Sequence, residues 1–497
     1  MLAALAPLVV LSQLFTTPTG VWTHLYQTVL PGYIGNTVFL MFGVAALTLL
    51  FAVPAAWLVT LYRFPFSNLF GWALILPLAF PAYILGYAYT PVFPGGGLLP
   101  ATLILSLALY PYVFVIARSS FARQGTAAIE ASQSLGRGAW ASFFRVALPL
   151  SRPALVAGVA LALMETLSDY GTVHYYAVDT FTTGIFRVWF GMGDAQAAAQ
   201  LSALLMGFVL MLLLGERWLR GRRGYQLSGG DRPFVKRDLT GLNRWAAFGF
   251  CAVLLIAAFV WPIAQLAIWS IDVAHLLDTR YFGWLLNTFL LAAAAAVIAV
   301  IVAVVLVFGA RLFKGALMTG LLRVATLGYA VPGTVIAVGV LIAFTWGDHR
   351  VNELSELLGG PVLGLIFSGT IAALVFGYVV RFLAVAVGSV ESGFNKIAPG
   401  IEEAARSLGA KPSRVLWRID LPLLKNALYA AGILTFIDVL KELPMTVMLR
   451  PFNFDTLAVR AYELASDEKL YEASLPALLI VLAALIPVLM LEKGIKR

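Results

Sequence analysis

Two stretches of the chain, EASQSLGRGAWASFFRVALP at residues 130–149 and EAARSLGAKPSRVLWRIDLP at residues 403–422, share eight of their twenty positions without a gap. Each stretch predicts a short helix that ends at a glycine, Gly136 or Gly409, because glycine readily takes the left-handed conformation of a helix C-cap. A second short amphipathic segment follows, and Leu-Pro then opens the next apolar run, since proline is tolerated in the first turn of a helix. The chain therefore carries the same polar hairpin twice.

The sequence around these hairpins is that of a membrane protein. Of its 497 residues 61% are hydrophobic and 12% are charged, about half the charged share of a soluble protein. Apolar runs long enough to cross a hydrocarbon core of about 30 Å as helices recur throughout. We place twelve helices, at about 1–16, 36–61, 68–90, 98–120, 153–171, 195–216, 244–271, 285–310, 318–345, 362–388, 424–445 and 472–491.

The positive residues predict the orientation of these helices. The net charge of +9 comes mainly from Lys and Arg between apolar runs, and no basic stripe with interleaved aromatic residues indicates nucleic acid. The predicted external segments hold only Arg187, Arg280, Arg350, Arg450, Arg460 and Lys469. Lys441 lies within a helix, and we count every other Lys and Arg as cytoplasmic. By the positive-inside rule, both hairpins and both termini face the cytoplasm of a multi-pass protein in the inner (plasma) membrane.

The two halves of the chain repeat each other. Asn36 and Pro81 recur as Asn287 and Pro332, both 251 residues later, and the offset becomes 273 after the following loop. Six helices per unit make the repeats parallel, with a two-fold axis along the membrane normal. The fold class is therefore an all-α membrane protein of two six-helix units.

Five segments follow from this repeat. They are the first, short helix with its external loop (1–35), the first transmembrane domain (36–217), a Gly- and Arg-rich cytoplasmic linker (218–243), the seventh helix with its external loop (244–284) and the second transmembrane domain (285–492). The start, MLAALAPLVVLSQLF, has no positive n-region and is short for a span. A truncated first helix and a cleaved signal peptide are both open interpretations.

The doubled hairpin resembles the permease subunits of type I ABC importers. Their signature is Glu-Ala-Ala, a glycine six residues after the Glu, and Ile-x-Leu-Pro. The second hairpin matches it at Glu403, Ala404, Ala405, Gly409, Ile419, Leu421 and Pro422. The first matches at Glu130, Ala131, Gly136, Leu148 and Pro149, with Ser132 and Val146 as small departures. The resemblance implies that each hairpin docks into a groove on a separate ATPase subunit, and two hairpins imply two copies of that subunit.

Nothing in the sequence predicts catalysis by this chain. No Gly-Lys dipeptide occurs, so the phosphate-binding P-loop is absent, and we expect ATP only on the partner ATPase. The single cysteine, Cys251, lies in an apolar run and supports neither a disulfide nor a Cys-based metal site. The histidines all fall on predicted external segments, as solvated or capping residues or, alternatively, as a metal relay; they are His24, His174, His275 and His349. We therefore expect no enzyme activity, bound cofactor or resident metal.

Charged residues inside predicted membrane helices are costly and suggest function. The fifth helix carries Glu165 and Asp169, and the eleventh carries Asp438, Lys441 and Glu442. Each carboxylate pair is spaced i, i+4, which predicts one helix face. A two-fold arrangement would turn them toward a shared pathway suited to a cation. Alternatively, Asp438 pairs with Lys441 and the other carboxylates cap helix ends.

The segments beginning at Met164 and Asp438 are similar to the ferric-iron branch of these permeases, whose members are tandem fusions of this length. The resemblance implies an importer for ferric iron that receives its substrate from an external binding protein. The external residues Thr183, Arg187, Thr456 and Arg460 are where that protein would dock. A permease for thiamine or another small solute, and a proton-coupled secondary transporter, are the alternatives; membrane lipid is the surrounding partner.

Overall fold

The computed structural model describes residues 2–124, 132, 134–136, 138–220, 236–276, 278–313 and 315–495. The centre of the predicted linker, 221–235, and the hairpin residues Glu130 and Ala131 lie outside the described residues. In the part described, the fold is all-helical except for one short parallel pairing of Tyr62–Arg63 with Arg237–Asp238. The predicted all-α fold class is confirmed.

The first half of the chain forms α1 (Leu2–Ser12), η1 (Gln13–Phe15), α2 (Gly20–Thr28), α3 (Leu30–Leu61), β1 (Tyr62–Arg63), α4 (Ser67–Ala73), η2 (Leu76–Ala79), α5 (Ala82–Ala88), α6 (Leu98–Gln124), α8 (Ala139–Ser142), η3 (Phe143–Ala147), α9 (Leu148–Ser168), α10 (Gly171–Tyr175), α11 (Phe181–Phe186), η4 (Arg187–Gly191) and α12 (Ala195–Arg220). The second half forms β2 (Arg237–Asp238), α13 (Gly241–Leu255), η5 (Ile256–Val260), α14 (Trp261–Asp272), η6 (Ala274–Leu276), α15 (Thr279–Leu312), α16 (Ala316–Ala325), η7 (Leu327–Ala330), α17 (Gly333–Leu357), α18 (Ile371–Phe394), α19 (Pro399–Ser407), α20 (Pro412–Val415), η8 (Leu416–Asp420), α21 (Leu421–Leu440), α22 (Pro444–Leu449), α23 (Leu457–Ser466) and α24 (Leu470–Ile495).

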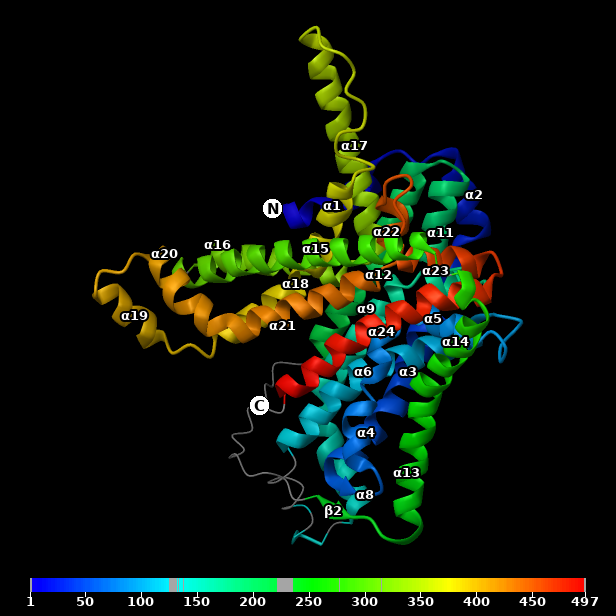
Figure 1. The fold of residues 1–497 in the computed structure, drawn as a ribbon, viewed down its shortest axis with the longest axis vertical. Coiled ribbons are helices and arrows are strands. Elements are labelled where there is room, and N and C mark those ends of the chain that lie inside the picture. The colour runs from blue at the N-terminus through cyan, green and yellow to red at the C-terminus, as the bar shows by residue number, and fades with distance from the viewer. Residues whose placement is uncertain are drawn as a thin grey trace.

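Two arms diverge from a common junction (Figure 1). Helices α3, α6 and α13 run down the view, whereas α15, α18 and α21 run across it to the left. The second hairpin, with α19 and α20, lies at the far end of the horizontal arm, and α8 of the first hairpin lies at the far end of the vertical arm. The two hairpins are therefore remote from the junction and from each other.

Nine helices within the described ranges are long and apolar enough to span a membrane. They correspond to the predicted second, fourth to eighth, tenth and eleventh helices, and to the second part of the predicted ninth, whose first part is the separate short helix Ala316–Ala330. The third is broken instead, with Ser67–Ala79 and Ala82–Ala88 bent by 96°. The first and the twelfth appear only as shorter apolar helices, Leu5–Phe15 and Leu470–Leu485. The predicted membrane segments are thus of three kinds in the structure: straight spans, one bent pair and short helices.

The repeated prolines are the points at which helices break. Pro81 precedes α5 and Pro332 precedes α17, each with an extended backbone that follows a short 3-10 turn. Proline has no N–H to continue a helix, so a break at the same repeat position in both units has a local cause. Unlike α5, α17 is long: its first part is buried, and its C-terminal part extends beyond the body (Figure 1).

The repeated asparagines fasten the outer loops. The Asn36 side chain donates to the Asp179 carbonyl at 2.8 Å, and Asn287 donates to the Asp455 carbonyl at 3.1 Å. A backbone carbonyl so held fixes the loop against the second helix of its unit. The sequence repeat therefore marks a repeated contact.

The first helix of each unit packs on the other unit. Helix α1 lies against α17, and the segment α13–η5–α14 lies along the vertical arm, while α14 also packs on α24 of its own unit. The Tyr89 hydroxyl donates to the Ala257 carbonyl at 2.6 Å across this boundary, and the Phe80 and Phe259 rings are 5.7 Å apart. This exchange ties the two units together through apolar surface.

The predicted tenth helix begins later than expected, at Ile371 rather than 362. The Asp348 carboxylate accepts hydrogen bonds from the backbone N–H groups of Ile366, Phe367 and Ser368. A buried carboxylate that gathers three N–H groups stabilises an irregular turn. We predicted a helix there from the apolar run and did not identify the role of Asp348.

Replacing Gly339 should weaken the packing of α1 on α17. A Cβ at this position of α17 would lie 2.4 Å from the Ala6 carbonyl oxygen, and such overpacking costs about 1–3 kcal/mol. We expect Gly339→Ala to lower the thermal unfolding midpoint of the purified protein. Gly388→Ala in α18, where a Cβ meets nothing within 4 Å, is the matched control and should not lower it. Equal midpoints for the two variants would contradict this packing.

Candidate functional site

The intramembrane carboxylates lie where two helices end. Helix α9 ends at Ser168, and Asp169 follows in an extended conformation; helix α21 ends at Leu440, before Glu442. The prediction that each carboxylate pair shares one helix face was therefore wrong. In each unit only the first member, Glu165 or Asp438, is on the long helix.

Asp169 and Glu442 instead hold the short helices that follow. Asp169 accepts from the Val173 N–H at 3.1 Å and the Thr172 hydroxyl at 2.9 Å. Glu442 accepts from the N–H groups of Met445 and Thr446, each at 3.0 Å. Exposed N–H groups at a helix start need an acceptor, and in an apolar surrounding a side chain must supply it. This is the capping role that the sequence left open as an alternative.

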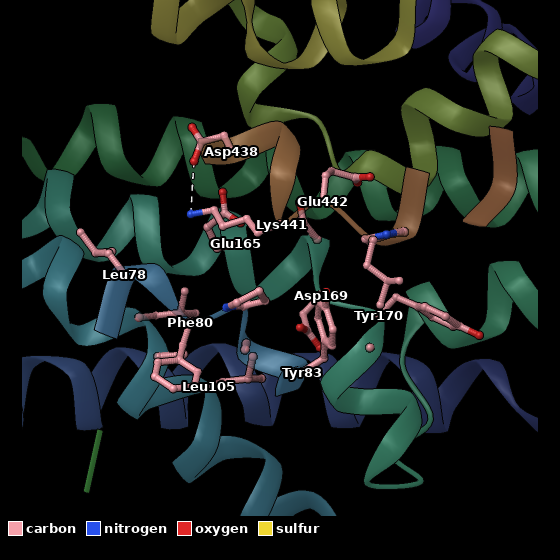
Figure 2. A pocket seen from close by; sticks show the side chains of 18 of the residues that line it. Leu78, Phe80, Tyr83, Leu105, Glu165, Asp169, Tyr170, Asp438, Lys441 and Glu442 are labelled. Carbon is pink, nitrogen blue, oxygen red and sulfur yellow. Dashed lines mark ion pairs between the residues drawn. The ribbon is translucent and has the colours of Figure 1, made fainter. Parts of the chain in front are cut away.

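These residues surround a cavity of about 100 Å³ at the junction of the two units. Its wall has four carboxylates, Glu165, Asp169, Asp438 and Glu442, and two cations, Arg381 and Lys441. Figure 2 shows Asp438, Lys441 and Glu165 grouped together, with Asp169 beside Tyr83. The Tyr83 hydroxyl is buried and has no hydrogen-bond partner among the described residues. The structure thus brings the five predicted pathway residues to one place.

Arg381 is the site residue that the sequence analysis missed. It is only 4% exposed, although we counted it with the cytoplasmic charges. Its guanidinium lies 3.3 Å from Glu442 and 3.9 Å from Glu165, which belongs to the other unit. The available signal was a lone cation inside the apolar run 362–388. Asp438 and Lys441 form the second pair, at 3.2 Å, as the alternative interpretation held.

Both cations come from the second unit. Their counterparts 273 residues earlier are Ala108 and Ser168, which also line the cavity. The pseudo-two-fold positions are thus shared but their charge is not. Of the three carboxylates paired with Arg381 and Lys441, Glu165 has the most exposed side chain, at 25%, and the long contact to Arg381 is its one ion pair among the described residues.

Aromatic residues join the two units beside this cavity. The Tyr170 and Tyr462 hydroxyls are 2.8 Å apart, and the Tyr462 hydroxyl is 3.1 Å from Nδ1 of His174. Burial lowers the pKa of His174, and the charge of Arg187 lowers it further. Among the described residues no three His, Cys, Asp or Glu side chains are grouped as a metal site.

The second hairpin has the predicted helix and glycine. Helix α19 ends before Gly409, whose φ of +82° is the left-handed conformation expected of a C-cap. Glu403 and Ala404 are exposed and Ala405 is half-buried. In the first hairpin Gly136 has a φ of +79°.

The Leu-Pro pairs stand in the first turns of α9 and α21, but both helices continue from the segment before them. Leu148 and Pro149 lie inside one apolar helix, Trp140–Ser168, and Leu421 and Pro422 lie inside Pro412–Leu440. In both, a π-helical turn, η3 or η8, directly precedes Leu-Pro. The predicted short segment is present before each span, as α8 or α20, but this turn joins it to the span in one continuous helix. Each hairpin is therefore rigidly connected to a helix that ends at the cavity.

Both hairpins expose apolar side chains at matching repeat positions. Leu135 and Leu408 are 82% and 88% exposed, and Phe144 and Trp417 are 56% and 71% exposed. Exposed apolar groups beside the glycines of two polar hairpins, as at Leu135 and Leu408, are typical of a surface that a partner covers.

The outer residues predicted to contact a binding protein divide into two kinds. Thr183 and Thr456 are buried, and their hydroxyls bond the backbone at the starts of α11 and α23. This burial corrects the expectation that they form a docking surface. Arg187 is half-exposed; burial alone would lower its pKa, but bonds to Asp179 and Tyr33 raise it. Arg460 lies over the Trp284 ring and pairs with Glu463 at 2.8 Å.

Comparison with known proteins gives a family and several relatives. The family described as "Binding-protein-dependent transport system inner membrane component" matches residues 48–220 and 295–495. The Fe(3+)-transport system permease protein FbpB 2 of Haemophilus influenzae is 27% identical over 93% of this chain and 89% of its own. The sulfate transport system permease protein CysT of Escherichia coli is 28% identical over 36% of this chain and 72% of its own. A chain of the bacterial alginate ABC transporter, in complex with an alginate pentasaccharide-bound periplasmic protein, has 13% identity and a TM-score of 0.38, covering 50% of this chain and 93% of that chain.

Removal of Arg381 should strongly destabilise the junction. Arg381→Met leaves Glu442 buried without its cation, and breaking such a pair costs about 3–5 kcal/mol. Arg350→Met removes a guanidinium from an exposed pair with Glu353 and should cost under about 1 kcal/mol. Chemical unfolding of the purified variants measures both.

The double variant Arg381→Met/Glu442→Gln separates charge from packing. Because it leaves no unpaired carboxylate at position 442, it should recover part of the loss. If it is as unstable as Arg381→Met alone, the ion pair is not the cause.

Proposed function

The chain belongs to the inner-membrane components of binding-protein-dependent transport systems, and we propose that it forms the pathway by which ferric iron enters the cell. It is a multi-pass permease subunit of an ABC importer and is not itself an enzyme. The iron assignment rests on one observation above others: similarity to an Fe(3+)-transport permease extends through both units, over 93% of the chain.

The charged cavity supports a pathway at the junction of the units. It is lined by both halves of the chain, as a shared pathway requires. Four carboxylates face two cations there, so the surplus charge is negative and suits a cationic substrate. Glu165 carries this argument best, because Asp169 and Glu442 are engaged by N–H groups and Asp438 by Lys441.

The hairpins supply the coupling to ATP hydrolysis. We assign one ATPase copy to each hairpin, where it docks on the exposed side chains of residues 130–149 or 403–422. The continuous helices Trp140–Ser168 and Pro412–Leu440 would carry hairpin movement to the cavity, since both end beside it. In the orientation that we propose, both hairpins and both termini face the cytoplasm.

On the opposite side, an external binding protein would deliver the substrate. Arg187 and Arg460 are the candidates retained for its docking, because both are partly exposed. The cross-unit contact between Tyr170 and Tyr462 lies beside the cavity. We propose that it separates when the loaded binding protein docks.

A small oxyanion is the second candidate substrate, favoured by the similarity of one unit to a sulfate permease. Arg381 and Lys441 could in principle bind an anion. Both are already paired with carboxylates, which favours the cation. Thiamine remains an alternative within the same class. A proton-coupled secondary transporter does not fit a binding-protein-dependent family.

The substrate is tested with the complete transporter. The permease and its ATPase are reconstituted in liposomes, and ATP hydrolysis is measured with the binding protein loaded with ferric iron, sulfate or thiamine, or empty. We expect stimulation by the iron-loaded protein alone. Stimulation by another load, with none by iron, would replace the iron assignment.

The hairpin role is tested with Glu403. Because this carboxylate is exposed, Glu403→Ala should leave the unfolding midpoint unchanged while lowering binding-protein-stimulated ATP hydrolysis by about 5-fold or more. The control Glu391→Ala removes another exposed carboxylate, on α18 outside the hairpin, and should retain full stimulation. Equal activities of the two variants would remove the docking role from Glu403.

A further inference from the structure

Asp420 is a buried carboxylate that the proposed pathway does not use. It lies in η8, between the second hairpin and α21, and it is 0% exposed. Neither of its carboxylate oxygens has a hydrogen-bond partner among the described residues. Burial of an unpaired carboxylate is costly, so the position calls for a function that outweighs the cost.

Arg311 holds the neighbouring carboxylate. At the end of α15 its guanidinium is 2.8 Å from Glu402 of α19, donates to the Phe394 carbonyl at 3.2 Å and lies over the Phe394 ring. This contact fixes the helix of the second hairpin to the arm. Arg311 and Glu402 are the charged groups that act on Asp420. One guanidinium thus stands near two carboxylates and pairs with only one.

The first unit has none of these charges. At the matching repeat positions Thr60 stands for Arg311, Ile129 for Glu402 and Ala147 for Asp420. The three charged residues therefore occur together in one unit and are absent together from the other. This pattern indicates a single device rather than three unrelated surface charges.

We propose that Arg311, Glu402 and Asp420 position the second hairpin in two alternative states. Arg311 pairs with Glu402 in the state seen here, and it pairs with Asp420 when the ATPase moves α19 away. Asp420 is unpaired here because its partner is engaged elsewhere. The proposal rests on the proposed docking of the hairpin to an ATPase, and it makes the second hairpin the one whose position is held by charge.

Amide hydrogen exchange of residues 400–410 tests whether Arg311 switches from Glu402 to Asp420. It is measured on the full chain with its ATPase, in lipid nanodiscs, at rest and after trapping with ATP and vanadate. Glu402→Gln should speed exchange at rest and leave the trapped state unchanged. Asp420→Asn should leave hydrogen exchange at rest unchanged and speed it in the trapped state, by about 5-fold or more. It should also raise the unfolding midpoint, because it removes an unpaired buried charge.

Two further variants complete the design. Arg311→Gln should speed exchange in both states, and the control Glu391→Gln, on an exposed carboxylate of α18, should change neither. A purely structural role would move the resting and trapped states alike. Parallel changes in both states for Glu402→Gln and Asp420→Asn would therefore overturn the switch.

No iron and no binding protein enter this measurement, so an error in the substrate does not affect its result. If the ATPase fails to protect the wild-type hairpin, the coupling role and the switch are overturned together. If protection is normal but the crossed pattern is missing, the switch alone is overturned.

Discussion

The arrangement of this membrane protein depends on how backbone N–H groups are satisfied where helices break inside the apolar region. Both units break after the long helix that leads from the hairpin, at Ser168 and at Leu440. Water is excluded from a hydrocarbon core, so each new helix start needs an acceptor from the chain itself. Asp169 and Glu442 supply it, and this requirement explains why carboxylates occur at the centre of a chain that is otherwise so apolar.

Hydrogen bonds from N–H groups favour the charged form of a buried carboxylate and burial opposes it, so a nearby cation adds to its stability. Arg381 answers Glu442 and reaches Glu165 of the other unit at 3.9 Å. The same residue therefore neutralises a cap and crosses the junction. Both long helices begin at the hairpins and end here. Under the coupling that we propose, a movement at either hairpin would reach this ion pair along one continuous helix.

The repeat, the all-α class, most helices and the grouping of five charged residues at one cavity could be predicted, because apolar length and matched spacing are local signals. The helix faces on which the carboxylates lie could not be predicted. A spacing of i, i+4 implies a shared face only if the helix continues, and its end at Ser168 depends on Asp169 turning to bond Val173 and Thr172. Arg381 was missed because counting charges assigns a residue to a side of the membrane and says nothing of its partners. Likewise, the burial of Thr183 and Thr456 follows from loop packing that no sequence period records.

Fusion of the two units in one chain has a physical consequence at the charged cavity. Two identical subunits would place the same residue at both pseudo-two-fold positions, so an added cation would appear twice. Here Arg381 and Lys441 face Ala108 and Ser168 across the axis. Two cations meet four carboxylates, whereas a symmetric pair of second units would offer equal numbers and cancel the negative surplus. The asymmetry of the tandem chain is therefore what leaves Glu165 with only the long contact to Arg381, and under the proposed function this carboxylate is the one that a cationic substrate would engage.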